Sequence, residues 1–353
     1  MPLRVPSILV KIALLSLSVV VAFVLAEGVL HVLVPPSKGN VFLFTLQSMR
    51  YKTMKPDNRA VIYGVPFETN QLGFRAETDW PPMKAPNEKR VLVLGDSYTV
   101  GAGVPFRSLY TQVAERELVS NQNNQDIKIL NMATGGYNIL QFYYTLTESG
   151  LALSPDYVVA AVLVAEDFDR MNLYEESRRI ASGGAPNISP WIARLYLTKA
   201  FGLYVQHSYN RLLGGVGVHG AISDPSAKLE ERRINEQALL DMQSVLDQKH
   251  IPFLVVLLPD CYSFKNQQKT QLDAALFLRS HNIEFIDMLP EFISDRHDPG
   301  YFTLNIIDRH PNPRYHQLVG DVLAKNLARR LHQDESSSTI KPEVLGSSSS
   351  GTK

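Results

Sequence analysis

Three residues of this sequence could together turn a serine into a nucleophile: Ser97, Asp308 and His310. A serine hydroxyl is a weak nucleophile until a neighbouring base removes its proton. An imidazole suits that task because its ordinary pKa lies near neutrality, and a carboxylate beside it fixes its tautomer and stabilises the imidazolium. Asp308 and His310 are two positions apart, so a turn of their loop would bring the two side chains together. The three residue types favour acyl transfer through a covalent serine intermediate.

Such a reaction also needs hydrogen-bond donors for the oxyanion of its tetrahedral intermediate. We expect the backbone N–H of Ser97, at the start of a helix, to be one donor. Gly136 is expected to supply another, because a residue without Cβ lets the backbone approach the substrate closely. Taken singly, each residue has an ordinary role, since a serine after a strand often caps a helix and a glycine often serves a turn. Only their joint placement favours a catalytic site.

The elements that must position these residues alternate between strand and helix. Buried strands are predicted from five short apolar runs, at residues 90–94, 127–130, 157–164, 252–258 and 283–287. Helices are predicted at residues 108–119, 139–148, 229–248, 269–280 and 314–331. This alternation predicts a three-layer α/β domain with a parallel sheet between two layers of helices. Ligands of such sheets bind beyond the carboxyl ends of the strands, where the candidate residues fall.

The first 36 residues are predicted to hold a transmembrane segment. Arg4 and Lys11 precede an apolar stretch at residues 12–34, which is long enough to cross a bilayer. We expect an uncleaved signal anchor, with a cleaved signal peptide or a buried helix as the alternatives. The early basic residues favour a cytoplasmic N-terminus, so the following domain is expected outside the cytoplasm, in the periplasm if the chain is bacterial.

Other segments lack a sustained period. Residues 37–89 are expected to form a linker and a small lead-in subdomain before the main domain at residues 90–333. Residues 170–228 interrupt the alternation and are interpreted as a packed surface insertion, with a substrate lid as the alternative. The Ser-rich tail at residues 334–353 is expected to be disordered.

Composition excludes several classes of protein. The formal net charge of the 353 residues is +0, which favours no nucleic acid as a partner. The single cysteine, Cys261, allows neither an intramolecular disulfide nor a cysteine-based metal site, and it is expected to be a buried filler. His316 is expected to be structural, and four other histidines show no metal-ligand spacing: His207, His219, His250 and His281.

Several segments together resemble the SGNH (GDSL) hydrolase family. Residues 93–104, VLGDSYTVGAGV, resemble its first block, and residues 131–141 resemble its second, with Gly136 at the position of the oxyanion glycine. Residues 308–312, DRHPN, are similar to the last block, which carries the catalytic aspartate and histidine. Residues 69–75 resemble a segment that precedes the first block in many membrane-anchored bacterial members.

The resemblance covers roughly residues 65 to 332 apart from the insertion. It implies a flavodoxin-like fold with strand order 2-1-3-4-5, and hydrolysis or transfer of acyl esters without a metal or other cofactor. The sequence departs from the family pattern in the third block. This block usually ends in Asn-Asp in the family, whereas this chain has Glu166-Asp167. Glu166 either donates to the oxyanion as a protonated acid, or points away from it, or impairs the site.

These observations predict an esterase, held at a membrane, that removes O-acyl groups such as acetyl from cell-envelope or exported carbohydrates. Lipid esters remain an alternative class of substrate. Two other functions stay open: an O-acyltransferase on the same triad, and a catalytically idle scaffold subunit of an envelope polysaccharide system, which the glutamate at position 166 would favour. The sequence leaves the oligomeric state open.

Overall fold

The computed structural model describes residues 7–35, 37–44, 48–121, 126–168, 225–305 and 308–338. Most of the segment expected to be an insertion, up to residue 224, lies outside these ranges, and so does the chain beyond residue 338. The expectations of a packed insertion and of a disordered tail therefore stay predictions.

A parallel sheet of five strands forms the centre of the domain, in the order β6-β5-β7-β8-β9. The strands are β5 (Glu88–Gly95), β6 (Asp126–Asn131), β7 (Tyr157–Leu163), β8 (Phe253–Leu258) and β9 (Phe285–Asp287). Counted within the sheet this order is 2-1-3-4-5, so the predicted fold class is confirmed. Every residue of β7 is buried, as expected for a central strand covered on both faces.

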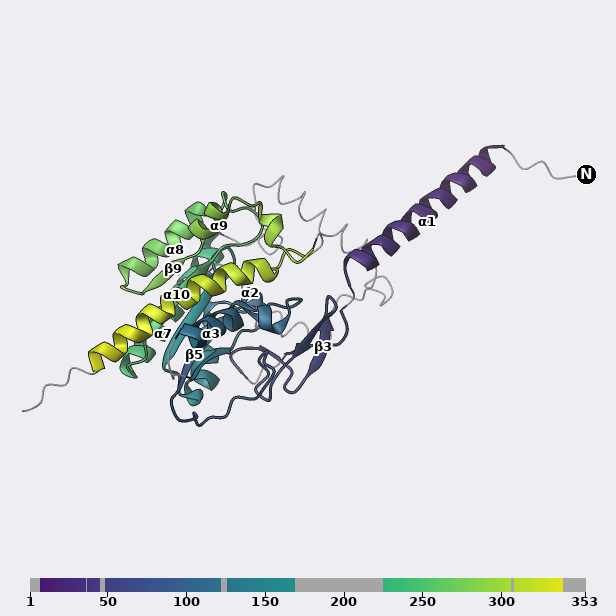
Figure 1. The fold of residues 1–353 in the computed structure, drawn as a ribbon. Helices are drawn as coiled ribbons and strands as arrows, with labels where there is room; N and C mark the ends of the chain where they lie inside the picture. The colour runs from purple at the N-terminus through teal and green to yellow at the C-terminus, as the bar shows by residue number, and fades with distance from the viewer. Residues whose placement is uncertain are drawn as a thin grey trace, which may run out of the picture.

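Helices cover both faces of the sheet (Figure 1). One face packs against α3 (Tyr110–Asn121), α9 (Leu289–Asp295) and α10 (Pro313–Ser338). The other packs against α4 (Ile139–Thr145), α7 (Pro225–Gln248) and α8 (Gln268–Ser280). Alternate residues of each strand enter the two cores, as Val91 and Val93 enter one and Leu92 and Leu94 the other. The period of two in the strands thus produces two separate cores.

Some boundaries differ from the sequence-based expectation. The helix that begins at Ile139 ends at Thr145 and continues as a wider π turn (Leu146–Gly150) and a 3₁₀ turn (Leu151–Leu153). The last helix runs to Ser338, seven residues beyond its expected end at residue 331. The short helix α9 was not expected, because seven residues with a proline near the start carry little periodic signal.

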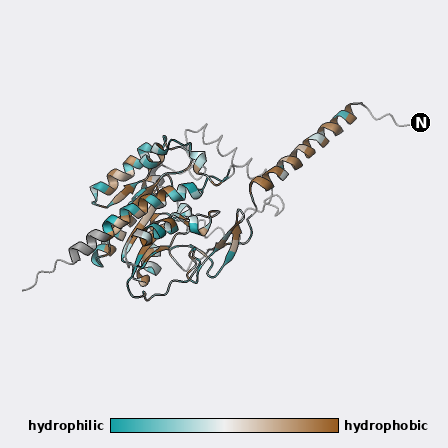
Figure 2. Ribbon diagram, in the orientation of Figure 1, coloured by the Kyte–Doolittle hydropathy of each residue, from teal (hydrophilic) through white to brown (hydrophobic). Residues whose placement is uncertain are grey.

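The N-terminal helix α1 (Ser7–Leu33) projects away from the domain (Figure 1). Its segment Val10–Leu33 is long and apolar enough to cross a membrane, and none of that window is buried against the rest of the chain. Figure 2 shows it as almost continuously hydrophobic, whereas the helices around the sheet also carry hydrophilic residues. Its length and composition suit a signal anchor and a signal peptide alike.

Two small antiparallel hairpins lie between α1 and the sheet domain. They are formed by β1 (Phe42–Phe44) with β2 (Lys52–Met54), and by β3 (Arg59–Ile62) with β4 (Val65–Glu68). Strands of three or four residues are too short to show an alternating pattern, which is why the sequence indicated no elements here. The hairpins pack on the domain through a third core made of Val41, Met54, Phe67, Val100 and Ala133.

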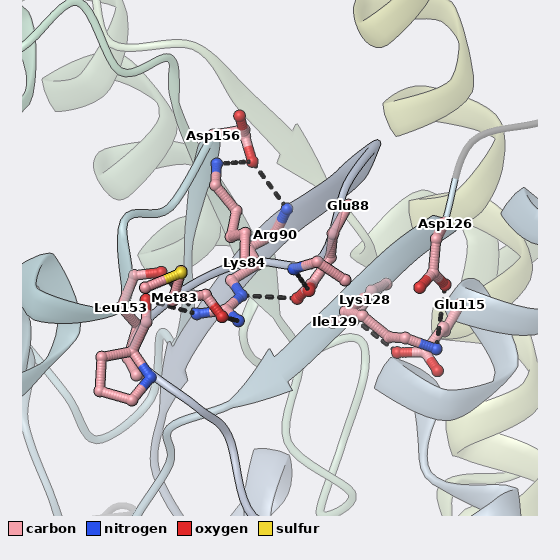
Figure 3. A network of polar contacts seen from close by, with 12 residues as sticks. Met83, Lys84, Glu88, Arg90, Glu115, Asp126, Lys128, Ile129, Leu153 and Asp156 are labelled. Atoms are coloured by element: carbon pink, nitrogen blue, oxygen red, sulfur yellow. Dashed lines mark hydrogen bonds and ion pairs between the residues drawn. The ribbon is translucent and has the colours of Figure 1, made fainter.

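The amino end of the sheet carries a polar network (Figure 3). The Arg90 side chain is 1% exposed; its Nε donates to Glu88 at 2.6 Å, and its Nη1 donates to the Leu153 carbonyl at 2.9 Å. Asp156 accepts hydrogen bonds from the backbone N–H of Arg90 at 2.8 Å and from Lys84 Nζ at 2.7 Å. These contacts join the start of β5 to the segments before β5 and before β7.

Candidate active site

Ser97 lies where β5 turns into the short helix α2 (Ser97–Val100). Asp96 caps this helix, because its Oδ1 accepts a hydrogen bond from the backbone N–H of Tyr98 at 2.8 Å. Gly95 allows the sharp turn, since a Cβ there would overlap the Thr99 side chain. Ser97 is therefore the first residue of a helix, where backbone N–H groups lack partners within the helix. Its hydroxyl is placed beyond the carboxyl end of β5.

The structure brings Ser97, His310 and Asp308 together. The Ser97 hydroxyl lies 2.9 Å from His310 Nε2, and His310 Nδ1 lies 2.6 Å from Asp308 Oδ1. The carboxylate requires the imidazole proton on Nδ1, which leaves Nε2 to accept a hydrogen bond from the serine hydroxyl. The loop that holds Asp308 and His310 makes the local turn that the sequence predicted. The backbone N–H of His310 also donates to Asp308 Oδ1, at 2.9 Å.

The charge of Asp308 is stabilised where it lies. Burial alone would raise the pKa of this carboxyl, but the hydrogen bond and charge of His310 and a hydrogen bond from Tyr63 lower it to about 2. The Asp308 side chain is 19% exposed and that of His310 is 42% exposed. Asp308 is thus ionised at neutral pH, and the imidazole that it orients is open to solvent.

The loop after β6 lies directly beside Ser97. A Cβ built on Gly135 would be 3.7 Å from the Ser97 Cβ and 3.2 Å from Cζ of Phe42. Gly136 has a φ of +84°, a left-handed backbone that favours glycine. The structure therefore places the loop after β6, within residues 131–141, beside Ser97. The assignment of the Gly136 and Ser97 N–H groups as oxyanion donors stays a prediction.

Glu166 and Asp167 follow β7, the strand beside β5, in a tight turn. The backbone N–H groups of both residues donate to the Leu163 carbonyl, Glu166 is partly exposed, and Asp167 is completely buried. Asp167 Oδ2 accepts from the Leu163 N–H at 2.8 Å. Burial, together with the charge of Asp96, raises the pKa of Asp167 well above its usual range. The role of Glu166 in the oxyanion site stays a prediction.

Two residues from the lead-in segment contact this site, and sequence reasoning missed both. The Tyr63 hydroxyl donates to Asp308 Oδ2 at 2.6 Å. The guanidinium of Arg75 is buried and donates to the carbonyls of Val100 and Gly101, where α2 ends. Arg75 lies within residues 69–75, which resemble a segment of membrane-anchored SGNH hydrolases. That resemblance only weakly indicated that Arg75 has a role at the site. Nothing local marks Tyr63.

The other residues singled out in the sequence have structural surroundings. Cys261 is buried, and burial raises the pKa of its thiol, as suits a filler rather than a nucleophile. His316 is buried and stacks on Tyr110, and burial followed by the charge of Arg75 lowers its pKa to about 3. His250 and His281 are exposed. Among the residues that the structure describes, no group of three His, Cys, Asp or Glu could hold a metal ion.

Comparisons with known proteins concern the fold. No family model matches the chain, and no curated protein matches it. A two-domain esterase active on acetylated mannans aligns with a TM-score of 0.41 and 16% identity over 72% of this chain, and the match spans 51% of that esterase. This chain therefore spans about half the length of that protein.

Two other solved structures are matched over nearly their whole length. A lipolytic protein of the G-D-S-L family from Desulfitobacterium hafniense DCB-2 has a TM-score of 0.40 and 14% identity, covering 67% of this chain and 98% of that one. An acetylxylan esterase from Geobacillus stearothermophilus has a TM-score of 0.41 and 15% identity, covering 70% and 96%. Likeness at this level assigns no activity. The strand order and three layers themselves define an α/β fold like that of SGNH hydrolases.

Proposed function

We propose that this chain is a serine-dependent ester hydrolase with Ser97 as its nucleophile. The observation that carries the proposal is the continuous chain of contacts from Asp308 through His310 to the Ser97 hydroxyl, at 2.6 and 2.9 Å. An idle scaffold has no need to hold these three side chains in one line at the exposed end of a sheet. The arrangement supports a working triad.

The reaction follows from this geometry. His310 Nε2 takes the proton of Ser97 Oγ as the oxygen attacks the ester carbonyl, and Asp308 stabilises the imidazolium. The imidazolium then protonates the departing alcohol, which leaves an acyl group on Ser97. A water molecule, deprotonated by His310, attacks the acyl carbonyl, and the imidazolium returns the proton to Ser97 as the carboxylic acid leaves. The N–H groups of Ser97 and Gly136 stabilise both oxyanions, with Glu166 as a further candidate.

The substrate class follows from where the domain is held. A helix suited to a membrane precedes the domain, so we place the domain outside the cytoplasm, with O-acyl groups such as acetyl on envelope or exported carbohydrates as its substrates. The His310 side chain is 42% exposed, and Tyr262, whose ring lies under the neighbouring Arg309, is 53% exposed. An open site with an exposed ring suits a bulky, hydrated polymer.

Labelling of the full chain in detergent with a fluorophosphonate probe tests the proposal. We expect labelling that Ser97→Ala abolishes, while Ser120→Ala, a serine bonded to its own helix on α3, keeps it. Folded wild-type protein that does not label would overturn the proposed function. Acetate release from acetylated glycans, measured with and without an added sugar acceptor, then separates hydrolysis from acyl transfer, because only a transferase makes an acylated acceptor.

A further inference from the structure

Both oxygens of Asp308 are engaged, and they are engaged by different parts of the chain. Oδ1 accepts from the Nδ1 and the backbone N–H of His310, both within its own loop. Oδ2 accepts from the hydroxyl of Tyr63, 245 positions earlier in the sequence, at 2.6 Å. A phenol that donates to a carboxylate at this distance makes a charge-assisted hydrogen bond, which is stronger than one between neutral groups.

The backbone holds Tyr63 in place for this contact. Tyr63 and Gly64 form the turn between β3 and β4, and both have positive φ, at 49° and 77°. The Tyr63 ring packs against Gly103, where a Cβ would approach its Cδ2 to 3.0 Å. Gly103 has a φ of +83°, so its backbone also favours glycine. The ring therefore occupies a slot that a larger residue at position 103 would close.

The hairpin that carries Tyr63 is also joined to the segment that leaves the membrane helix. The N–H of Tyr63 donates to Ser37 Oγ at 3.1 Å. Lys38 and Val61 exchange two backbone hydrogen bonds, at 2.6 and 2.9 Å. Figure 1 shows β3 between α1 and the body of the domain. Two successive sets of contacts thus connect α1 to the triad. Residues 37 and 38, which follow α1, bond to the β3–β4 hairpin, and Tyr63 in that hairpin bonds to Asp308.

We propose that Tyr63 is a positioning residue of the triad, and that the β3–β4 hairpin belongs to the catalytic unit. This inference rests on the proposed function. The Tyr63 hydroxyl holds the carboxylate of Asp308 in the orientation that His310 requires. It also takes up part of the negative charge, which limits how strongly Asp308 stabilises the imidazolium. Loss of the hydroxyl therefore loosens the triad and favours protonation of the imidazole.

The effect on pH dependence has a definite sign. The reaction needs a neutral imidazole, so its rate falls on the acid side as His310 gains a proton. Removal of the Tyr63 hydroxyl leaves more charge on Asp308, so protonation of the imidazole begins at a higher pH. Other titratable or charged groups lie near the His310–Asp308 pair among the described residues. The Tyr98 ring on α2 packs against His310, and Tyr262 after β8 interacts with the charge of Asp308. Arg309 lies over the Tyr262 ring and interacts with Asp260, and Asp96 lies beside Ser97.

The test compares Tyr63→Phe with wild type and with Tyr301→Phe in the full chain in detergent. Tyr301 is a matched control because its ring contacts His297 and Arg314, which are not triad residues. The rate of fluorophosphonate labelling is measured from about pH 5 to about pH 9, which brackets the ordinary imidazole pKa. Thermal unfolding is measured in parallel.

We expect Tyr63→Phe to label about tenfold more slowly at neutral pH, as for the loss of one hydrogen bond to a charged group. Its acid limb should lie about half a pH unit higher, and Tyr301→Phe should match wild type. Slower labelling with an unchanged acid limb would mean a packing role only and would overturn the inference, as would a wild-type rate and profile. Wild-type protein that does not label overturns the proposed function instead, and this inference with it.

Discussion

The two ends of the sheet both hold charged side chains, and they hold them in opposite ways. At the amino end, Arg90 is buried among Glu88 and backbone carbonyls, and its contacts join neighbouring segments (Figure 3). At the carboxyl end, His310 is 42% exposed and its two nitrogens point along a line from Asp308 to Ser97. A buried, fully partnered charge fixes the fold, whereas a partly exposed imidazole remains available to a substrate.

This contrast predicts whether a substitution changes stability or activity. Removal of Arg90 would take one donor from the Glu88 carboxylate and one from the buried Leu153 carbonyl, where water cannot easily replace it. Removal of the His310 imidazole would leave groups that solvent can hydrate. The contacts of Arg90 should therefore control stability and those of the triad should control activity, and two substitutions test that division.

The largest effect is expected from His310→Ala. Loss of the base should lower the rate of fluorophosphonate labelling by about 10³-fold or more. Stability should change by less than about 1 kcal/mol, because the side chain is partly exposed. Labelling rates and urea unfolding, measured on the same preparation, check both parts. Labelling within tenfold of wild type would show that another group serves as the base.

Arg90→Met should have the opposite profile. We expect the free energy of unfolding to fall by about 3 kcal/mol, since one member of a buried ion pair is removed. Arg233→Met is the control, because that side chain is 72% exposed and its pair with Glu230 lies on the surface, and it should cost less than about 1 kcal/mol. Labelling by folded Arg90→Met should equal that of wild type. A large loss of labelling without loss of stability would refute the division.

A smaller effect is expected from Asp167→Asn, and it depends on pH. Burial and Asp96 raise the pKa of Asp167 in the folded protein, so ionisation of Asp167 favours the unfolded chain. This penalty is absent below the unfolded pKa of about 4 and grows as the pH rises above it. An asparagine avoids it while keeping an acceptor for the Leu163 N–H.

The asparagine variant should therefore be more stable than wild type by about 1 kcal/mol at neutral pH, with the gain vanishing below about pH 4. Asp273→Asn, on the exposed face of α8, is the control and should show no such dependence. Urea unfolding at several pH values measures both variants. A gain that is equal at acidic and neutral pH would contradict the account of Asp167 as a penalised buried carboxyl.

Much of the sheet domain, and the placement of four residues of the candidate site, could be predicted from the sequence. The strands are runs of apolar residues, and parallel topology places their carboxyl ends together, so Ser97 and Gly136 had to lie at one edge. Asp308 and His310 are two positions apart and needed only a local turn. Each of these inferences depends on a local sequence pattern of a few residues, or on a general rule of α/β sheets.

The rest was decided by tertiary structure. Strands of three and four residues are too short to show a period, so the hairpins between α1 and the sheet were not predicted. Tyr63 reaches Asp308 across 245 positions of sequence, and Arg75 reaches the end of α2 across 25 and 26. The sequence by itself determined which residues can do the chemistry and which strands carry them. Only packing decided which distant side chains hold them in place, because contacts between remote segments leave no local pattern.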